Sequence, residues 1–436
     1  MPRAKTEAKD EARSEAPASR RLGPRPLALH LAVAALTWQS SRNAWPIWNG
    51  GSLPWKDEAA AAALRRALEK VDPDAFAKAL DGAVRARSLQ LLRGIQAYQR
   101  HPYRRDLTDP AALWQGGTTR LLDYGRTGSK SSGSKSSGSK RGRKGPVLLF
   151  VPSLINRAYI LDLAADCSLV RDFAARGFRP LLVDWDRPGP EERRFSLTDY
   201  IAGRLEAALD AALALDDGPV VAVGYCMGGL LALALAQRRP RDLAGLVLMA
   251  TPYDFHAGGA AQARALSRAT LGFGPAMDLL GELPVDAIQA LFALLDPQLV
   301  VRKFLSFGRL DPANAKAAAF VALEDWLNDG VPLAAPVARE CLQGWYGENT
   351  PGEDRWLVAG RAVAPARLDL PALSLIPAND RIVPPGSARA LAARLPRGEA
   401  LEPALGHIGM VVSFKARTAV WDPLAEWCRA AAERAG

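Results

Sequence analysis

The sequence VVAVGYCMGGLLALALAQR, residues 220–238, joins two apolar runs through a turn rich in glycine. VVAV is a short β-branched run typical of a buried strand, whereas LLALALAQR has the composition of a helix. Between them, Gly224 and Gly228 stand two residues before and two residues after Cys226. A strand-to-helix turn this sharp strains the residue at its apex and admits only small residues at those two positions. The pattern therefore predicts a nucleophile elbow with Cys226 at its apex.

The predicted turn also favours a reactive thiolate at Cys226. It places the sulfur at the start of a helix, where the helix dipole and the free N–H groups stabilise an anion. The alternative interpretation is that Cys226 is a small buried residue in a glycine-rich turn without chemistry. The presence of suitably placed acid and base residues elsewhere in the chain decides between the two.

Further apolar runs on both sides of the elbow predict strands. They are continuous leucine-rich or β-branched runs alternating with helical stretches, which is typical of a parallel sheet covered on both faces. The runs are VLLFVPS at 147–153, PLLVDW at 180–185, LAGLVLMAT at 243–251 and ALSLIPA at 372–378. We therefore expect a doubly wound, mostly parallel α/β sheet. The last two runs are too far apart for an ordinary crossover, and helical segments at 260–271 and 314–328 predict an inserted lid between them.

The remaining segments differ in composition. Residues 1–25 lack apolar periodicity and predict a disordered tail. Residues 26–115 predict an N-terminal helical region, in which Pro73 separates two helices between residues 57 and 100. Residues 127–144 form a Ser/Gly/Lys repeat that predicts a flexible loop. The α/β core is expected in two parts, 116–255 and 366–436, separated by a lid over 256–365.

A base facing Cys226 is expected after the last strand. His407, in the glycine-flanked segment ALGHIG, has this position and follows Cys226 in the chain. Of the other histidines, His30 and His101 are expected at structural or surface positions, and His256 is expected as a loop residue with a satisfied side chain.

Asp380, in IPANDRIVPP, ends a strand run at the carboxyl edge of the predicted sheet, where ligands bind in open α/β folds. Such an aspartate can accept a hydrogen bond from Nδ1 of His407 and leave Nε2 facing the nucleophile. A turn-forming aspartate without a catalytic role is the alternative. The backbone N–H groups of Met227 and Leu154 are expected to form the oxyanion hole.

Six segments, taken in order, resemble polyhydroxyalkanoate synthases, most closely the short-chain (class III) enzymes that work with a second subunit. They are VPSLINRAYILDL (151–163), LLVDWDRPGPEERRFSLTDYI (181–201), GYCMGG (224–229), VLMATPYDF (247–255), NDRIVPP (379–385) and GHIGMVVS (406–413). Six ordered motifs are more specific than the elbow alone. The resemblance extends over roughly residues 100–430 and implies the α/β-hydrolase fold.

The resemblance implies that Cys226 is the acylated nucleophile, His407 the base and Asp380 its partner. It further implies a 3-hydroxyacyl-CoA substrate, a polyester product or granule, a second subunit or a homodimer as partner, and no metal or organic cofactor. Arg381 departs from the family, which commonly has histidine at that position. The Ser/Gly/Lys loop and the long N-terminal region also lie outside the family core.

Two alternative functions stay open. The same residues with freer access of water to the acyl group would make a cysteine-nucleophile hydrolase, either an intracellular polyhydroxyalkanoate depolymerase or a thioesterase. A granule-associated protein that keeps the fold without using it is the second alternative, because fold alone does not fix function.

The composition limits which partners, cellular location and membrane segments are expected. The formal charge of +10 lies in residues 1–25, with net +3, and residues 126–144, with net +7, so the body is near neutral and no nucleic-acid partner is expected. The four cysteines show no disulfide or zinc spacing, which favours a cytoplasmic protein. No apolar run has the length of a membrane span, and LALHLAVAAL at 27–36 predicts an amphipathic or docking helix.

Overall fold

The computed structural model describes residues 21–41, 57–125, 145–215 and 218–435. Its centre is an eight-stranded sheet in the order β1-β2-β6-β3-β7-β8-β13-β14. β1 and β2 are antiparallel, and the strands from β6 to β14 run parallel to one another. The strands are β1 (Ala112–Gly116), β2 (Thr119–Asp123), β3 (Val147–Val151), β6 (Arg179–Asp184), β7 (Val220–Tyr225), β8 (Gly245–Met249), β13 (Ala372–Leu375) and β14 (Gly398–Leu401). The predicted doubly wound, mostly parallel sheet is confirmed.

The sequence runs predicted as strands form β3, β6, β7, β8 and β13. The sheet contains three strands that the sequence did not predict. β1 and β2 form a hairpin at one edge, so the expected start of the core at residue 116 falls inside β1. β14 closes the other edge, where the residues GEAL leave most of its side chains exposed and give no apolar pattern.

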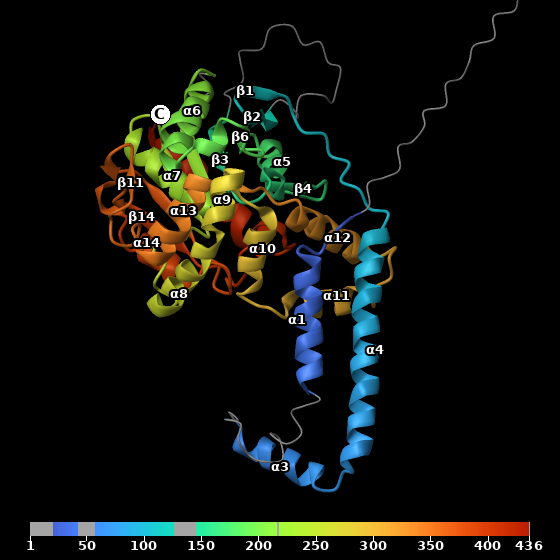
Figure 1. Cartoon of the computed structure of the whole chain (residues 1–436). Helices are drawn as coiled ribbons and strands as arrows, with labels where there is room; N and C mark the ends of the chain where they lie inside the picture. Colours follow the sequence, from blue (N-terminus) through green and yellow to red (C-terminus); the bar gives the residue numbers. More distant parts are fainter. Residues whose placement is uncertain (1–20, 42–56, 126–144, 216–217, 436) are drawn as a thin grey trace, which may run out of the picture.

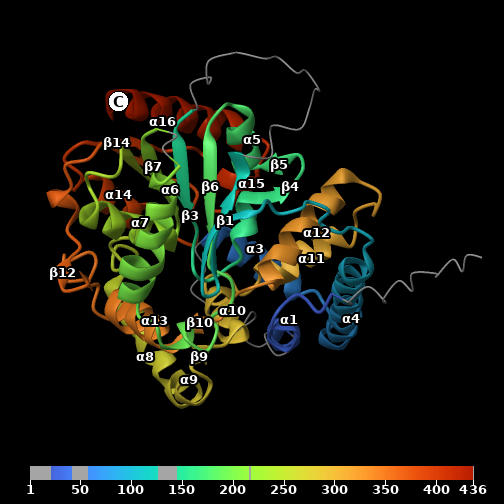
Figure 2. The ribbon, with the colours of Figure 1, turned by 90° about the horizontal axis from the view of Figure 1, so that it is seen from above.

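Helices cover both faces of the sheet (Figure 2). α6 (Glu206–Leu213) and α7 (Met227–Arg238) pack on one face, and α5 (Leu169–Ala175) and α16 (Asp422–Ala435) pack on the other. Residues 227–236 of α7 are buried on all sides, as expected of a helix that is apolar all round. This burial fixes the helix whose first turn follows Cys226.

The lid, residues 256–365, lies between β8 and β13 in the chain. Its helices are α8 (Ala260–Thr270), α9 (Gly274–Leu280), α10 (Val285–Ala293), α11 (Leu299–Phe307), α12 (Ala315–Asn328) and α13 (Ala335–Arg339), followed by the π-helical turn η7 (Glu340–Gly347). Two short ladders complete it, β9 (Glu282–Leu283) with β10 (Leu333–Ala334), and β11 (Leu357–Val358) with β12 (Arg361–Ala362). After β13, α14 (Pro385–Ala392) and α15 (Gly409–Val412) return to the core.

Among the described residues, seven ion pairs join the lid to the rest of the chain, each between an arginine outside the lid and a carboxylate on the lid. They are Arg21–Asp325, Arg25–Asp286, Arg157–Asp329, Arg187–Glu282, Arg193–Glu282, Arg381–Asp296 and Arg394–Asp354. Opposite charges on the two surfaces favour this arrangement of the lid on the rest of the chain and disfavour other ways of docking it.

The N-terminal helices form an arm beside the core (Figure 1). α1 (Leu27–Ser40) and α4 (Pro73–Arg100) pack against α11 of the lid, and α3 (Glu58–Leu68) lies at the far end of the arm. Pro73 begins α4, as the predicted break requires. Within the described ranges, no helix combines the length and the apolar character needed to cross a membrane.

The prediction that residues 1–25 form a disordered tail is wrong for residues 21–25. Nε of Arg21 lies 2.7 Å from Oδ1 of Asp325, and the backbone N–H of Arg25 donates to Oδ1 of Asn328 at 2.8 Å. Both partners belong to α12 of the lid, so residues 21–25 are held by polar contacts that composition does not reveal. Residues 1–20 and the whole of the predicted loop 127–144 lie outside the described residues.

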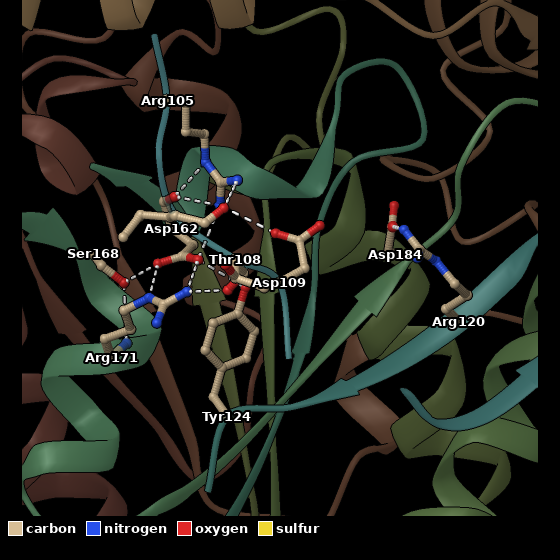
Figure 3. Close-up of polar contacts among 10 residues, drawn as sticks. Arg105, Thr108, Asp109, Arg120, Tyr124, Asp162, Ser168, Arg171 and Asp184 are labelled. Carbon is tan, nitrogen blue, oxygen red and sulfur yellow. Dashed lines mark hydrogen bonds and ion pairs between the residues drawn. The ribbon is translucent and has the colours of Figure 1, made fainter. Parts of the chain in front are cut away.

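A buried carboxylate ties the segment before β1 to the core (Figure 3). Asp162, in the short strand β4 (Asp162–Ala164), which pairs with β5 (Cys167–Ser168), is fully buried. Its carboxylate accepts hydrogen bonds from Arg105, Tyr124, Ser168 and Arg171 at 2.6–3.0 Å. The guanidinium groups of Arg105 and Arg171 therefore compensate the charge of the buried Asp162 carboxylate.

We predict that Asp162→Ala lowers the free energy of unfolding by about 3 kcal/mol, because it leaves two partly buried arginines without their shared carboxylate. Asp109→Ala is the matched control, since Asp109 also contacts Arg105 but is 43% exposed, and its loss should cost less than about 1 kcal/mol. Denaturant unfolding of both variants measures the difference. Equal losses of unfolding free energy in the two variants would show that the buried Asp162 carboxylate contributes no more to stability than the exposed one of Asp109.

Candidate active site

Cys226 occupies the turn between β7 and α7. Its backbone has φ 55° and ψ −126°, a conformation that side-chain-bearing residues rarely adopt. Its N–H donates to the carbonyl oxygen of Met249 at 2.8 Å, and its carbonyl oxygen accepts from the N–H of Gly229 at 2.9 Å. The neighbouring strand β8 and the first turn of α7 therefore hold the strained residue from both sides.

The glycines around Cys226 are sites of close backbone approach. A Cβ atom on Gly224 would lie 2.4 Å from Cα of Gly229, and one on Gly228 would lie 2.0 Å from the carbonyl oxygen of Val151. Both contacts involve backbone atoms, which cannot move aside as a flexible side chain can. These distances give the physical reason for the predicted Gly-x-Cys-x-Gly pattern. Gly229 lies outside the Gly-x-Cys-x-Gly pattern but is also tightly packed, because a Cβ atom on it would lie 1.9 Å from Oγ1 of Thr251.

We predict that Gly228→Ala lowers the free energy of unfolding by at least about 2 kcal/mol, because the new methyl group must displace β3 from α7. Gly203→Ala is the matched control. No atom lies within 4 Å of a Cβ at Gly203, so alanine there should be neutral or stabilising by about 0.5–1 kcal/mol. Thermal unfolding of both variants checks the contrast, and equal stability would contradict the packing argument.

His407 and Asp380 lie together at the carboxyl end of the sheet. Asp380 follows β13, and His407 lies in the loop between β14 and α15. Nδ1 of His407 is 2.6 Å from Oδ2 of Asp380, and both side chains are buried. Oδ1 of Asp380 accepts from the N–H groups of Ile382 and Val383 at 2.8 and 2.9 Å. Asp380 is thus fixed by its own turn and fixes the ring of His407.

The second partner of His407 is Cys226. Burial alone lowers the pKa of His407, but attraction to the Cys226 sulfur, together with hydrogen bonds to Asp380 and Cys226, outweighs burial and raises the pKa to about 10. The ring is therefore hydrogen-bonded to the Asp380 carboxylate and is influenced by the Cys226 sulfur. The structure brings the three predicted catalytic side chains into one cluster, and their catalytic roles remain a prediction.

The raised pKa gives a testable pH dependence. The folded-state pKa lies above the ordinary value of 6.5, so this stabilising contribution is complete below about pH 6.5 and is lost as the pH rises through about 10. Cys226→Ala removes the sulfur and should lower the pKa of His407, measured by NMR titration of its ring. Cys428→Ala, in α16, should leave that pKa unchanged. An unchanged pKa in Cys226→Ala would refute the Cys226–His407 coupling.

The two residues predicted to line the oxyanion hole belong to the elbow and to the segment after β3. Met227 is the first residue of α7, directly after Cys226. Leu154 lies in the turn after β3, and its side chain belongs to the hydrophobic core. The N–H of the next residue, Ile155, donates to Oγ of Ser153 at 3.2 Å.

A cavity of about 240 Å³ contains Cys226 and His407 in its wall. The core contributes the loop after β3, the lid contributes α10, α11 and α12, and the N-terminal segment contributes Pro24, Arg25 and His30. Much of the lining is apolar, as at Ile155, Phe292, Leu299, Val300, Trp326 and Ile382. A largely apolar lining with a few polar groups is typical of small-molecule sites, and the lid forms part of its wall.

Some lining residues were not predicted from the sequence. His30 takes the structural alternative expected for it, since it is buried with Nε2 3.1 Å from the carbonyl oxygen of Arg25. Its place in the cavity wall was not predicted. The buried Oδ1 atom of Asn156 lacks a hydrogen-bond partner among the described residues. Arg381 lies at the edge of the cavity, 82% exposed and 3.5 Å from Asp296 of the lid. No sequence signal indicates these roles, because they depend on how the lid docks.

The other histidines lie outside the cavity. Nε2 of His256 is 3.0 Å from the carbonyl oxygen of Tyr346, and Nε2 of His101 is 3.0 Å from that of Pro312. Over the part of the chain that the structure describes, no cluster of three or more His, Cys, Asp or Glu side chains could hold a metal ion.

Comparison with known proteins defines the class. A family model described as alpha/beta hydrolase fold matches residues 146–413, more than half of the chain. This match agrees with the sheet order, the nucleophile elbow and the inserted lid.

Similarity to three curated relatives identifies a particular family within this fold class. The poly(3-hydroxyalkanoate) polymerase subunit PhaC of Synechocystis is 30% identical over 292 residues, covering 65% of this chain and 77% of that protein. The PhaC subunit of Allochromatium vinosum is 28% identical over 286 residues, covering 64% and 79%. That of Haloferax mediterranei is 28% identical over 284 residues, covering 64% and 58%, so the chain spans less than two thirds of this relative. The chain belongs to the poly(3-hydroxyalkanoate) polymerase family of α/β-hydrolase-fold proteins.

Proposed function

We propose that this chain is a polyester-forming acyltransferase that takes 3-hydroxyacyl groups from CoA thioesters. The observation that carries the proposal is the contact of 2.6 Å between Nδ1 of His407 and Oδ2 of Asp380, with Cys226 as the other partner of the same ring. This is the arrangement of a nucleophile, a base and an orienting acid. The names of the relatives supply the substrate class.

In the first step, the Cys226 thiolate attacks the thioester carbonyl carbon and forms a carbon–sulfur bond. Backbone N–H groups of Met227 and Leu154 stabilise the negative oxygen. The hydrogen bond between Ile155 and Ser153 supports this choice, because it engages the neighbouring N–H. Collapse breaks the bond to the CoA sulfur, and His407 gives that sulfur its proton. One thioester replaces another, so the acyl group stays activated.

In the second step, His407 accepts the proton of a hydroxyl group from another hydroxyacyl unit or from the growing chain. The hydroxyl oxygen attacks the acyl-cysteine, an ester bond forms, and the Cys226 thiolate leaves. Water must be kept from the same carbonyl, and the apolar lid residues around the cavity serve this purpose. The reaction needs no metal or organic cofactor.

The proposal extends to partners and location. The relatives are named as subunits, which supports a second synthase subunit, with a homodimer as the alternative. We assign the chain to the cytoplasm at the surface of its polyester, since Cys226 must stay a free thiol.

The test is thiol release from (R)-3-hydroxybutyryl-CoA, with analysis of the product as polymer or free acid. Purified protein should release CoA and form polymer, and Cys226→Ala should lower the rate by at least about a thousandfold. Cys428→Ala, which removes a buried cysteine in α16, is the matched control and should keep the activity.

Two outcomes would contradict the proposal. Free 3-hydroxybutyrate as the sole product, with the same dependence on Cys226, would show a hydrolase. Release of CoA that Cys226→Ala leaves unchanged would show that the elbow is not the catalytic site.

A further inference from the structure

A charged pair from the lid lies in the wall of the catalytic cavity. Nζ of Lys303, on α11, is 2.6 Å from Oε1 of Glu324, on α12. The Glu324 side chain is 4% exposed and that of Lys303 is 20% exposed. Both residues line the cavity that contains Cys226 and His407.

Stability alone does not explain this pair. Burial raises the pKa of the Glu324 carboxyl, and Lys303 opposes that effect, so the surroundings disfavour the charge that the pair maintains. The neighbouring cavity residues Leu299, Val300 and Trp326 are apolar. A buried ion pair contributes little net stability, because the cost of removing water offsets the attraction, and apolar side chains of similar size would join the two helices as well.

The chemistry of the pair matches a hydroxyl group. A lysine ammonium donates up to three hydrogen bonds, one of which goes to Glu324, and a carboxylate has two acceptor oxygens. A hydroxyl accepts one hydrogen bond and donates another, so it can complete a triangle with an ammonium and a carboxylate. A methylene group at the same place can do neither, so the remaining donors of the ammonium and the second oxygen of the carboxylate would stay unsatisfied in an apolar wall.

We propose that Lys303 and Glu324 bind the hydroxyl group of the hydroxyacyl substrate and thereby select hydroxylated over plain acyl chains. This inference rests on the proposed function, in which hydroxyacyl groups reach Cys226 from CoA thioesters. The pair determines specificity and holds the acyl chain, whereas Cys226 and His407 carry out the chemistry. The lid thus supplies selectivity as well as closure.

The experiment compares (R)-3-hydroxybutyryl-CoA with butyryl-CoA, which differ only in the hydroxyl, so contacts to CoA cancel in the ratio. Initial CoA release in a single turnover gives kcat/KM for the acylation of Cys226 by each thioester. In the double variant Lys303→Met, Glu324→Met, the preference for the hydroxylated thioester should fall at least about tenfold. Acylation by butyryl-CoA should change less than about threefold.

Lys316→Met removes an exposed lysine from the same lid helix, α12, and is the matched control that should keep the wild-type preference. A folded double variant with an unchanged preference would overturn the inference while leaving the proposed function intact. Failure of the unmodified protein to release CoA from either thioester would instead contradict the proposed function and this inference together.

A binding measurement keeps the inference testable should the double variant fail to fold. Cys226→Ala cannot be acylated at residue 226, so equilibrium binding of the two thioesters to it reports recognition alone. Lys303 and Glu324 should make the hydroxylated thioester bind at least about tenfold more tightly. Equal affinities would refute the role of the pair.

Discussion

The backbone of Cys226 is the constraint on which the site depends. At φ 55° and ψ −126° this residue has a strained backbone. Its hydrogen bond to Met249 and the close packing of Gly228 on Val151 hold it in that conformation. β3, β7, β8 and the buried helix α7 must all be in place before the sulfur is presented at the edge of the sheet. The parallel core of the sheet therefore positions the Cys226 side chain.

The base and the acid reach Cys226 from segments far away in the chain. β13 and β14 end at the same edge of the sheet, and the loops that follow them carry Asp380 and His407. The lid closes above this edge through arginine–carboxylate pairs and lines the cavity with apolar side chains and one ion pair. In the proposed mechanism, the same insertion keeps water from the acyl group and selects which acyl group enters.

Much of this architecture could be predicted from the sequence. The apolar runs of the central strands and the short motifs around Cys226, Asp380 and His407 are local features with a direct physical meaning. The edge strand β14 has no such signal, because its side chains are exposed. The placement of His30 and of the Lys303–Glu324 pair in the cavity follows from docking between segments distant in sequence, which neither periodicity nor spacing encodes.

The central claim is that Cys226 carries the acyl group. Brief incubation with (R)-3-hydroxybutyryl-CoA, acid quenching and peptide mass spectrometry test it directly. The account predicts one 3-hydroxybutyryl group or a short oligomer on the peptide that contains Cys226, and none on that peptide in Cys226→Ala. An acyl group on another residue, or turnover without any acylated peptide, would contradict it.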